Sequence, residues 1–200
     1  MTTTSPRGAG HGSPAQRERR RRILDATVTL ASQGGYDAVQ MRAVAEHADV
    51  ALGTLYRYFP SKVHLLVSTL ARELEHAVAG LEGKPVPGDS AADRVLYVLD
   101  EGTSTFRGRP RLTEGVTRAF MFADSSVADD IRVVERYVGR MILLGIRAEG
   151  ATAEATEEEL AIVKVVGDVW LASLVQWVTG RSSLEDVRHS VELAVRLLLR

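Results

Sequence analysis

Residues 39–66, VQMRAVAEHADVALGTLYRYFPSKVHLL, contain two short helical patterns separated by a tight turn. In the first pattern, apolar side chains recur at the three- and four-residue spacing of one buried helix face, at Met41, Val44, Ala45 and Ala48. Asp49 follows as a turn residue, because its side chain can hydrogen-bond its own main chain and it tolerates a left-handed backbone. The stretch therefore begins with a helix and a turn.

The second pattern runs from Ala51 to Tyr58 and is about two helical turns long. It ends at Phe59, because the residue before Pro60 resists helical geometry. Ser61 is suited to cap a third helix by accepting from that helix's free amides. Two short helices joined by a tight turn form a helix-turn-helix.

The two faces of the second helix differ in polarity. Leu55 and Phe59, four residues apart, are predicted to pack inward, so most of the other side chains must face outward. An outward surface of hydroxyl, phenol, arginine and glycine suits contacts with phosphates and bases, and Lys62 adds a charge in the first turn of the next helix. The alternative is a helical hairpin whose tyrosines only cover a core. We predict that the contacts with double-stranded DNA come from Arg19, Gln40, Arg42, Leu52, Gly53, Thr54, Tyr56, Arg57, Tyr58 and Lys62.

Composition indicates an ordinary soluble globular chain of 200 residues, with 45% hydrophobic and 26% charged residues. There is no cysteine, which excludes disulfides and thiolate metal sites. No apolar run approaches the roughly 20 residues that span a bilayer, and the N-terminus lacks the apolar core of a signal peptide. We therefore expect a cytoplasmic protein with no membrane partner.

Charge is unevenly divided along the chain. Residues 1–62 hold nine Lys and Arg against five Asp and Glu, whereas residues 63–200 hold sixteen against twenty-one. The basic part coincides with the helix-turn-helix, as expected of a DNA-binding head on a body that phosphate repels.

The segment before the motif divides into two parts. Residues 1–15 are rich in Gly, Pro and Ser, and we predict a disordered tail. An arginine run in residues 17–22 opens a helix that ends at Gly34 and Gly35, where a left-handed C-cap is available. The run is either a solvated helix face or a basic arm that reaches the DNA backbone or a minor groove.

The sequence GTLYRYFPSKVHLL, preceded by MRAVAEHADV, resembles the DNA-binding domain of the TetR family of ligand-responsive transcriptional repressors, with a match over residues 17–70. The chain departs from the family pattern at Gln40 and Ala51, where a Ser or Thr cap is usual, and at Asp49, where Gly is frequent. These departures affect the phosphate contact that the cap hydroxyls usually make and leave the motif intact.

The whole chain is similar to the branch of this family that represses cholesterol and steroid catabolism. This similarity is carried by QRERRRRILDAT, LTEGVTRAFMFAD, VGDVWLASLVQW and LAVRLLL. It implies a repressor that is released from operator DNA by an apolar ligand, a sterol-side-chain acyl thioester of coenzyme A. The alternative is a TetR-type regulator of fatty-acid metabolism or efflux that senses a different apolar small molecule.

We predict an all-α fold with an N-terminal three-helix DNA-binding domain, residues 16–62, and a connecting helix, residues 63–82. The sequence GKPVPGD then breaks the helical pattern. A C-terminal helical ligand-binding and dimerisation domain follows, residues 83–200. Within it we expect helices at 91–107 and 112–123, a cap at 124–126 for a helix reaching the Gly150 region, and two terminal helices starting near 157 and 184.

The last two helices carry more apolar surface than one body buries easily. Residues 162–178 are apolar in nearly all directions. Pairing these helices with their copies across a twofold axis gives a four-helix interface, which favours a homodimer on a palindromic operator. The alternative is a monomer with a thicker core.

Family resemblance also implies a ligand cavity among the middle helices. The candidate walls are apolar or aromatic, although ordinary core packing is the alternative for each: Leu99, Phe106, Phe120, Met121, Phe122, Tyr137, Met141, Trp170 and Leu174. Phosphates of the ligand would meet Arg107, Arg109, Arg111 and Arg118, whose alternative role is that of solvated charges near a helix end.

Nothing in the sequence predicts an enzyme, a metal site or a cofactor. The histidines His11, His47, His64, His76 and His189 lack metal-ligand spacing, and there is no nucleophile elbow or phosphate loop. Three acidic residues at 157–159 suit a helix N-terminus better than a catalytic cluster. A non-sensing architectural DNA protein would need only the head, which leaves the rest of the chain unexplained.

Overall fold

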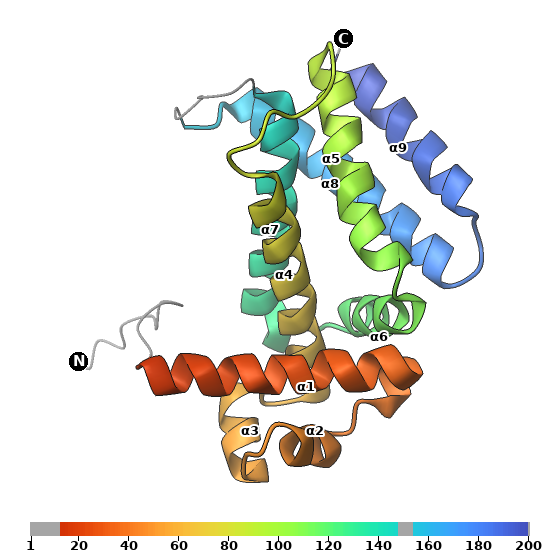
Figure 1. Ribbon diagram of the computed structural model, residues 1–200. Coiled ribbons are helices and arrows are strands. Elements are labelled where there is room, and N and C mark those ends of the chain that lie inside the picture. The colour runs from red at the N-terminus through yellow and green to blue at the C-terminus, as the bar shows by residue number, and fades with distance from the viewer. Residues whose placement is uncertain (1–12, 148–153, 200) are drawn as a thin grey trace.

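A computed structural model describes residues 13–147 and 154–199, so most of the predicted tail, His11 and the Gly150 region lie outside the described residues. This part of the chain is helical and contains no strand. The helices are α1 (Pro14–Ala38), α2 (Met41–His47), α3 (Leu52–Tyr58), α4 (Lys62–Leu81), α5 (Ala91–Arg107), α6 (Pro110–Met121), the short η1 (Ser125–Val127), α7 (Ala128–Ile146), α8 (Glu157–Val178) and α9 (Leu184–Leu198). Helices α1, α2 and α3 form a head below, and the remaining helices form a body above it (Figure 1).

The head is held by the apolar faces that the sequence predicts. Val44 and Ala45 of α2 and Leu55 of α3 are buried together with Phe59. The turn residue Asp49 has a φ of 51°, the left-handed backbone expected of it. The helix-turn-helix is therefore confirmed in its faces and in its turn.

Helix starts follow the local sequence. Ser61 accepts from the His64 amide at the start of α4, and Thr156 and Ser183 form capping boxes at α8 and α9. Gln40 and Ala51, by contrast, make no side-chain cap at α2 and α3. Helix α6 spans 110–121 rather than the predicted 112–123, because Pro110 is well suited to the first turn of a helix.

The double glycine of α1 interrupts the helix without ending the element. Gly35 has a φ of 66°, so the helix breaks at Gly34 and Gly35 and one further turn follows up to Ala38. This turn carries Tyr36 and Asp37, which face the body.

Helix α8 corrects the expectation that no segment is apolar enough to span a membrane. By length and composition this 22-residue helix is long and apolar enough, with a mean hydropathy of 1.5 in its most apolar window. Only 28% of that window is buried. Lys164 and Asp168 interrupt the apolar run, which is why reading for uninterrupted segments missed it. One such helix is weak evidence for a membrane span, because a core helix of a soluble protein has the same length and composition.

Helices α5 and α7 approach each other at Gly145. A Cβ built on Gly145 would lie 2.7 Å from both the Cα and the N of Val95. Arg94 Nε donates to the Gly145 carbonyl over 3.0 Å at the same crossing. Backbone atoms thus fill the place that a side chain would need.

Gly145→Ala is expected to destabilise the protein by about 1–3 kcal/mol, because the methyl group must push two helix backbones apart. Gly80→Ala in α4 is the matched control, since nothing lies within 4 Å of its added Cβ and a helical alanine is favoured by up to about 1 kcal/mol. Urea unfolding of both variants measures the difference. Equal stability for the two variants would contradict this account of the α5–α7 crossing.

Candidate nucleic-acid interface and effector cavity

Helix α3 lies at the outer end of the head (Figure 1), and most of its polar side chains are exposed or partly exposed. Tyr56 is 45% exposed, and Leu52, Gly53 and Arg57 are also exposed. Thr54 and Tyr58 are partly buried. A Cβ built on Gly53 would meet nothing within 4 Å, so the backbone of α3 can be approached closely. These features suit an element that enters a groove of DNA.

The other predicted DNA contacts lie on neighbouring elements. Gln40 and Arg42 are exposed at the start of α2, where Gln40 Nε2 donates to the Asp37 carbonyl. Arg19 is partly buried on α1. Much of the arginine run makes contacts inside the head: these are Arg20 over the Phe59 ring, Arg21 with Glu18 and Asp25, and Arg22 with Asp49. These contacts were not predicted, and they weaken the interpretation of the run as a free basic arm.

Lys62 lies in the first turn of α4 and is held in place by an aromatic ring. Its Nζ lies 3.9 Å from the centre of the Tyr36 ring, which also lies 4.7 Å from the Arg118 guanidinium carbon. Burial lowers the pKa of Lys62, and Arg118 lowers it further, while Asp37 acts in the opposite direction. The ammonium is thus tied to a particular place beside α3.

Helix α6 of the body fixes the turn that carries Tyr36. The Tyr36 amide donates to Glu114 Oε2 over 2.8 Å, and Arg118 pairs with Asp37 at 3.1 Å. A Cβ built on Gly115 would lie 3.1 Å from the Tyr36 nitrogen, so α6 and this turn are in close contact. The position of Lys62 therefore depends on α6 through Tyr36.

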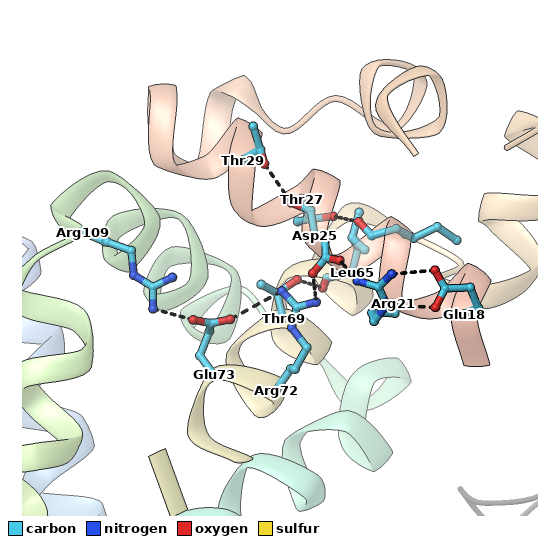
Figure 2. A network of polar contacts seen from close by, with 11 residues as sticks. Glu18, Arg21, Asp25, Thr27, Thr29, Leu65, Thr69, Arg72, Glu73 and Arg109 are labelled. Atoms are coloured by element: carbon cyan, nitrogen blue, oxygen red, sulfur yellow. Dashed lines mark hydrogen bonds and ion pairs between the residues drawn. The ribbon is translucent and has the colours of Figure 1, made fainter. Parts of the chain in front are cut away.

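A second junction between head and body consists of ionic groups. Figure 2 shows Arg72 of α4 between Asp25 of α1 and Glu73, with Arg109 on the far side of Glu73. The distances are 2.7 Å from Arg72 to Asp25, 3.5 Å from Arg72 to Glu73 and 2.5 Å from Arg109 to Glu73. Glu73 is only 5% exposed, so its charge requires both guanidinium groups.

An apolar cavity lies between α4, α5, α6 and α8. Its volume is about 30 Å³. It is lined by Leu70, Leu74, Phe106, Thr113, Thr117, Phe120, Trp170, Leu171, Leu174 and Val175. Four of the predicted wall residues are among these, namely Phe106, Phe120, Trp170 and Leu174.

The other predicted wall residues do not line this cavity. Met121 and Phe122 are 48% and 59% exposed, because α6 ends there and Phe122 turns its ring toward Tyr36 outside the cavity. Met141 is buried in the core against Gly102. Tyr137 is partly buried on α7, where burial and a hydrogen bond with Glu75 raise its pKa. Leu99 lines a separate crevice between α5 and α9.

Sequence reading also missed six cavity residues: Leu70, Leu74, Thr113, Thr117, Leu171 and Val175. Leu70 and Leu74 belong to a recognised apolar stripe, but nothing local distinguishes a cavity wall from core.

The four arginines proposed for phosphates have different surroundings. Arg107 pairs with Asp100, Arg109 with Glu73 and Arg118 with Asp37 and Glu114, while Arg111 is exposed.

Comparisons with known proteins agree with this arrangement. The model of bacterial regulatory proteins of the TetR family matches residues 23–69, and the tetracyclin repressor-like C-terminal domain model matches residues 88–198. The HTH-type transcriptional repressor KstR of Rhodococcus jostii is 54% identical over 187 residues, which cover 94% of this chain and 85% of that protein.

Solved structures have the same fold. A TetR transcriptional regulator from Rhodococcus sp. RHA1 is 31% identical with a TM-score of 0.83, covering 92% of this chain and 97% of that one. FadR of Thermus thermophilus, a repressor solved in complex with lauroyl-CoA, is 19% identical with a TM-score of 0.65, covering 90% and 93%.

Two substitutions separate affinity from sequence preference. Lys62→Ala is expected to weaken binding to every duplex and to reduce the slope of log affinity against log salt by about 1, because it would remove the predicted contact of Lys62 with a phosphate. Arg57→Ala is expected to change which sequences are preferred. Fluorescence anisotropy on operator and random duplexes over a salt series measures both effects.

Lys84→Ala is the matched control, because Lys84 is an exposed lysine beyond the body end of α4. Its affinity and salt slope are expected to equal those of the wild type. Equal losses on operator and random DNA for Lys62→Ala and Arg57→Ala would contradict the division of roles.

Proposed function

Because this chain belongs to the TetR family of bacterial regulatory proteins, we propose that it represses genes of steroid catabolism and that an apolar acyl-CoA-type ligand releases it from DNA. Membership of this family makes it a transcriptional regulator and not an enzyme. The observation that carries the proposal is the 54% identity to the KstR repressor over 94% of the chain. The steroid assignment rests on the resemblance to the steroid branch of the family, and the thioester also on the FadR structure with lauroyl-CoA.

A homodimer on a palindromic operator is part of this proposal. The support comes from apolar side chains that α8 and α9 leave in solvent: Leu160, Val165, Leu193, Leu197 and Leu198. Exposed apolar side chains on two helices that pack together favour an interface, and a twofold partner would present the same side chains in return. Two heads then reach two half-sites about one turn of DNA, or a multiple, apart.

Ligand binding is proposed to reach the head through the helices that line the cavity. A volume of about 30 Å³ has room for little more than one or two waters, so a large ligand requires the surrounding helices to move. Helices α4 and α6 are both cavity walls and supports of the head, through Arg72 and Glu114. A ligand that prefers the displaced arrangement lowers DNA affinity by its differential affinity for the two states.

The first test is a titration of the operator complex with ligand. A steroid-side-chain acyl-CoA thioester is expected to dissociate the complex at least tenfold more effectively than free coenzyme A, as measured in a mobility-shift assay. Lauroyl-CoA serves as the comparison for a fatty-acid regulator. Release by lauroyl-CoA alone would replace the steroid assignment, and a complex insensitive to all three would reject release by ligand.

The second test concerns the dimer. Leu197→Glu on α9 is expected to produce monomers in analytical ultracentrifugation and to lower operator affinity at least tenfold, because a charge in an apolar interface lacks a partner. Tyr97→Glu on α5 is the control, since Tyr97 is another exposed apolar residue outside the α8 and α9 surface. A Leu197→Glu variant that stays dimeric would place the interface elsewhere.

A further inference from the structure

A crevice lies between α5 and α9, distinct from the apolar cavity. Its volume is about 270 Å³. Apolar side chains form its inner part: Leu96, Leu99, Val187 and Val191. Asp100, Arg188 and Glu192 form its rim, and Thr103 and Trp170 close it on the inside.

Trp170 is the partition between the crevice and the apolar cavity, because it lines both. It is 1% exposed, and its indole Nε1 donates to Thr103 Oγ1 over 3.0 Å. Thr103 lines the crevice, whereas Phe106, on the next turn of α5, lines the apolar cavity. The two spaces thus border the same tryptophan side chain.

The volumes of the two spaces indicate which of them can accept a ligand without a rearrangement of the helices. Sites for small molecules are typically about 300–1,000 Å³ and mainly apolar. The crevice, at 270 Å³, is close to this range, and the apolar cavity, at 30 Å³, is far below it. Enlarging the apolar cavity displaces helices that are fastened to the head, whereas occupying the crevice does not.

The rim indicates which part of a ligand it accepts. Arg188 pairs with Asp100 at 2.9 Å, Arg107 approaches the same carboxylate at 3.3 Å, and Glu192 stands nearby on the rim. Arg196 pairs with Glu192 at 2.8 Å and with Asp93 at 3.3 Å. Three guanidinium groups and three carboxylates thus roughly cancel, so the rim has little attraction for a polyphosphate. It does offer donors and acceptors to a neutral keto or hydroxyl group.

We propose that the crevice between α5 and α9 is a binding site for the neutral, apolar ring part of the effector, with Trp170 as its inner wall. This inference rests on the proposed function and adds to it the place and the polarity of the ligand. The ligand's apolar rings contact the leucines and valines, and a keto or hydroxyl group lies at the Asp100–Arg188 rim. Phosphate groups of a thioester remain outside this rim.

The site adjoins the proposed dimer surface through α9. Val187 and Val191 of this helix face the crevice, while Leu193 and Leu197 are exposed on the surface assigned to the partner. A ligand in the crevice therefore contacts a helix that also packs against the second copy. This position allows it to alter the spacing of the two heads without entering the core.

The chain contains no cysteine, so a single introduced thiol reports on one position. Val191→Cys places the thiol in the crevice, and Ser190→Cys places it at an exposed position of the same helix outside it. The probe is progesterone, a neutral steroid with two keto groups. At saturation it is expected to slow alkylation of Cys at position 191 by N-ethylmaleimide at least fivefold and to leave position 190 unchanged.

A second measurement tests the same site if the thiol at position 191 does not react with N-ethylmaleimide. In a Trp177→Phe background Trp170 is the sole tryptophan, and quenching of its fluorescence gives the progesterone affinity. Val191→Phe fills the crevice and is expected to weaken binding at least tenfold, with operator binding kept as evidence of folding. Arg140→Met is the control, because Arg140 pairs with Glu82 and neither residue lines the crevice.

The outcomes separate this inference from the proposed function. Unaltered alkylation at position 191 together with unaltered affinity in Val191→Phe overturns the crevice site, as does a wild type that does not bind progesterone. Release of the operator by the thioester would then still support the proposed function. Protection of position 191 without release of DNA by any thioester supports the site and rejects the proposed mechanism.

Discussion

The structure depends on one contact between head and body, the attachment of Tyr36 to α6. The Tyr36 amide reaches Glu114, its ring carries the ammonium of Lys62, and Gly115 lets the two backbones come close. A larger residue at 115 would press against the Tyr36 turn. The hydrogen bond, the cation–π contact and the close backbone approach all involve Tyr36. The position of the head is therefore coupled to α6 as well as to α4, the helix that connects head and body.

The second attachment between head and body is a buried ionic group. Glu73 is a buried carboxylate shared by Arg72 and Arg109, and Arg72 is in turn shared with Asp25. The Arg72 Nε is buried and has no hydrogen-bond partner among the described residues. Removing one guanidinium from such a group leaves a buried charge only partly compensated, which is strongly unfavourable. Intermediate positions are therefore disfavoured, and a change at one member affects α1, α4 and the start of α6 together.

Local chemistry made the head predictable, and distance in sequence limited the rest. The apolar spacing of Val44 and Leu55, the turn at Asp49 and the cap at Ser61 each depend on residues within one or two turns. Glu114 lies 78 positions from Tyr36, and no periodicity connects them. Only four of the ten cavity residues were predicted, for a similar reason. Aromatic residues were the natural candidates, yet Phe122 falls just beyond the end of α6, and the leucines of α4 look like any other core residues.

Helix α8 connects the functions that the sequence suggested separately. Trp170 forms a wall of both inner spaces, whereas Val165 of the same helix is exposed on the surface assigned to the second copy. Helix α8 is apolar in nearly all directions because one side packs inside the body and another is left for the second copy. A core helix with the same pattern would instead be buried on every side. A ligand that repositions the indole would thus act on a helix that is also proposed to pack against the second copy. Coupling between effector and DNA then needs only rigid helices with two packed arrangements, and it needs no separate relay of side chains.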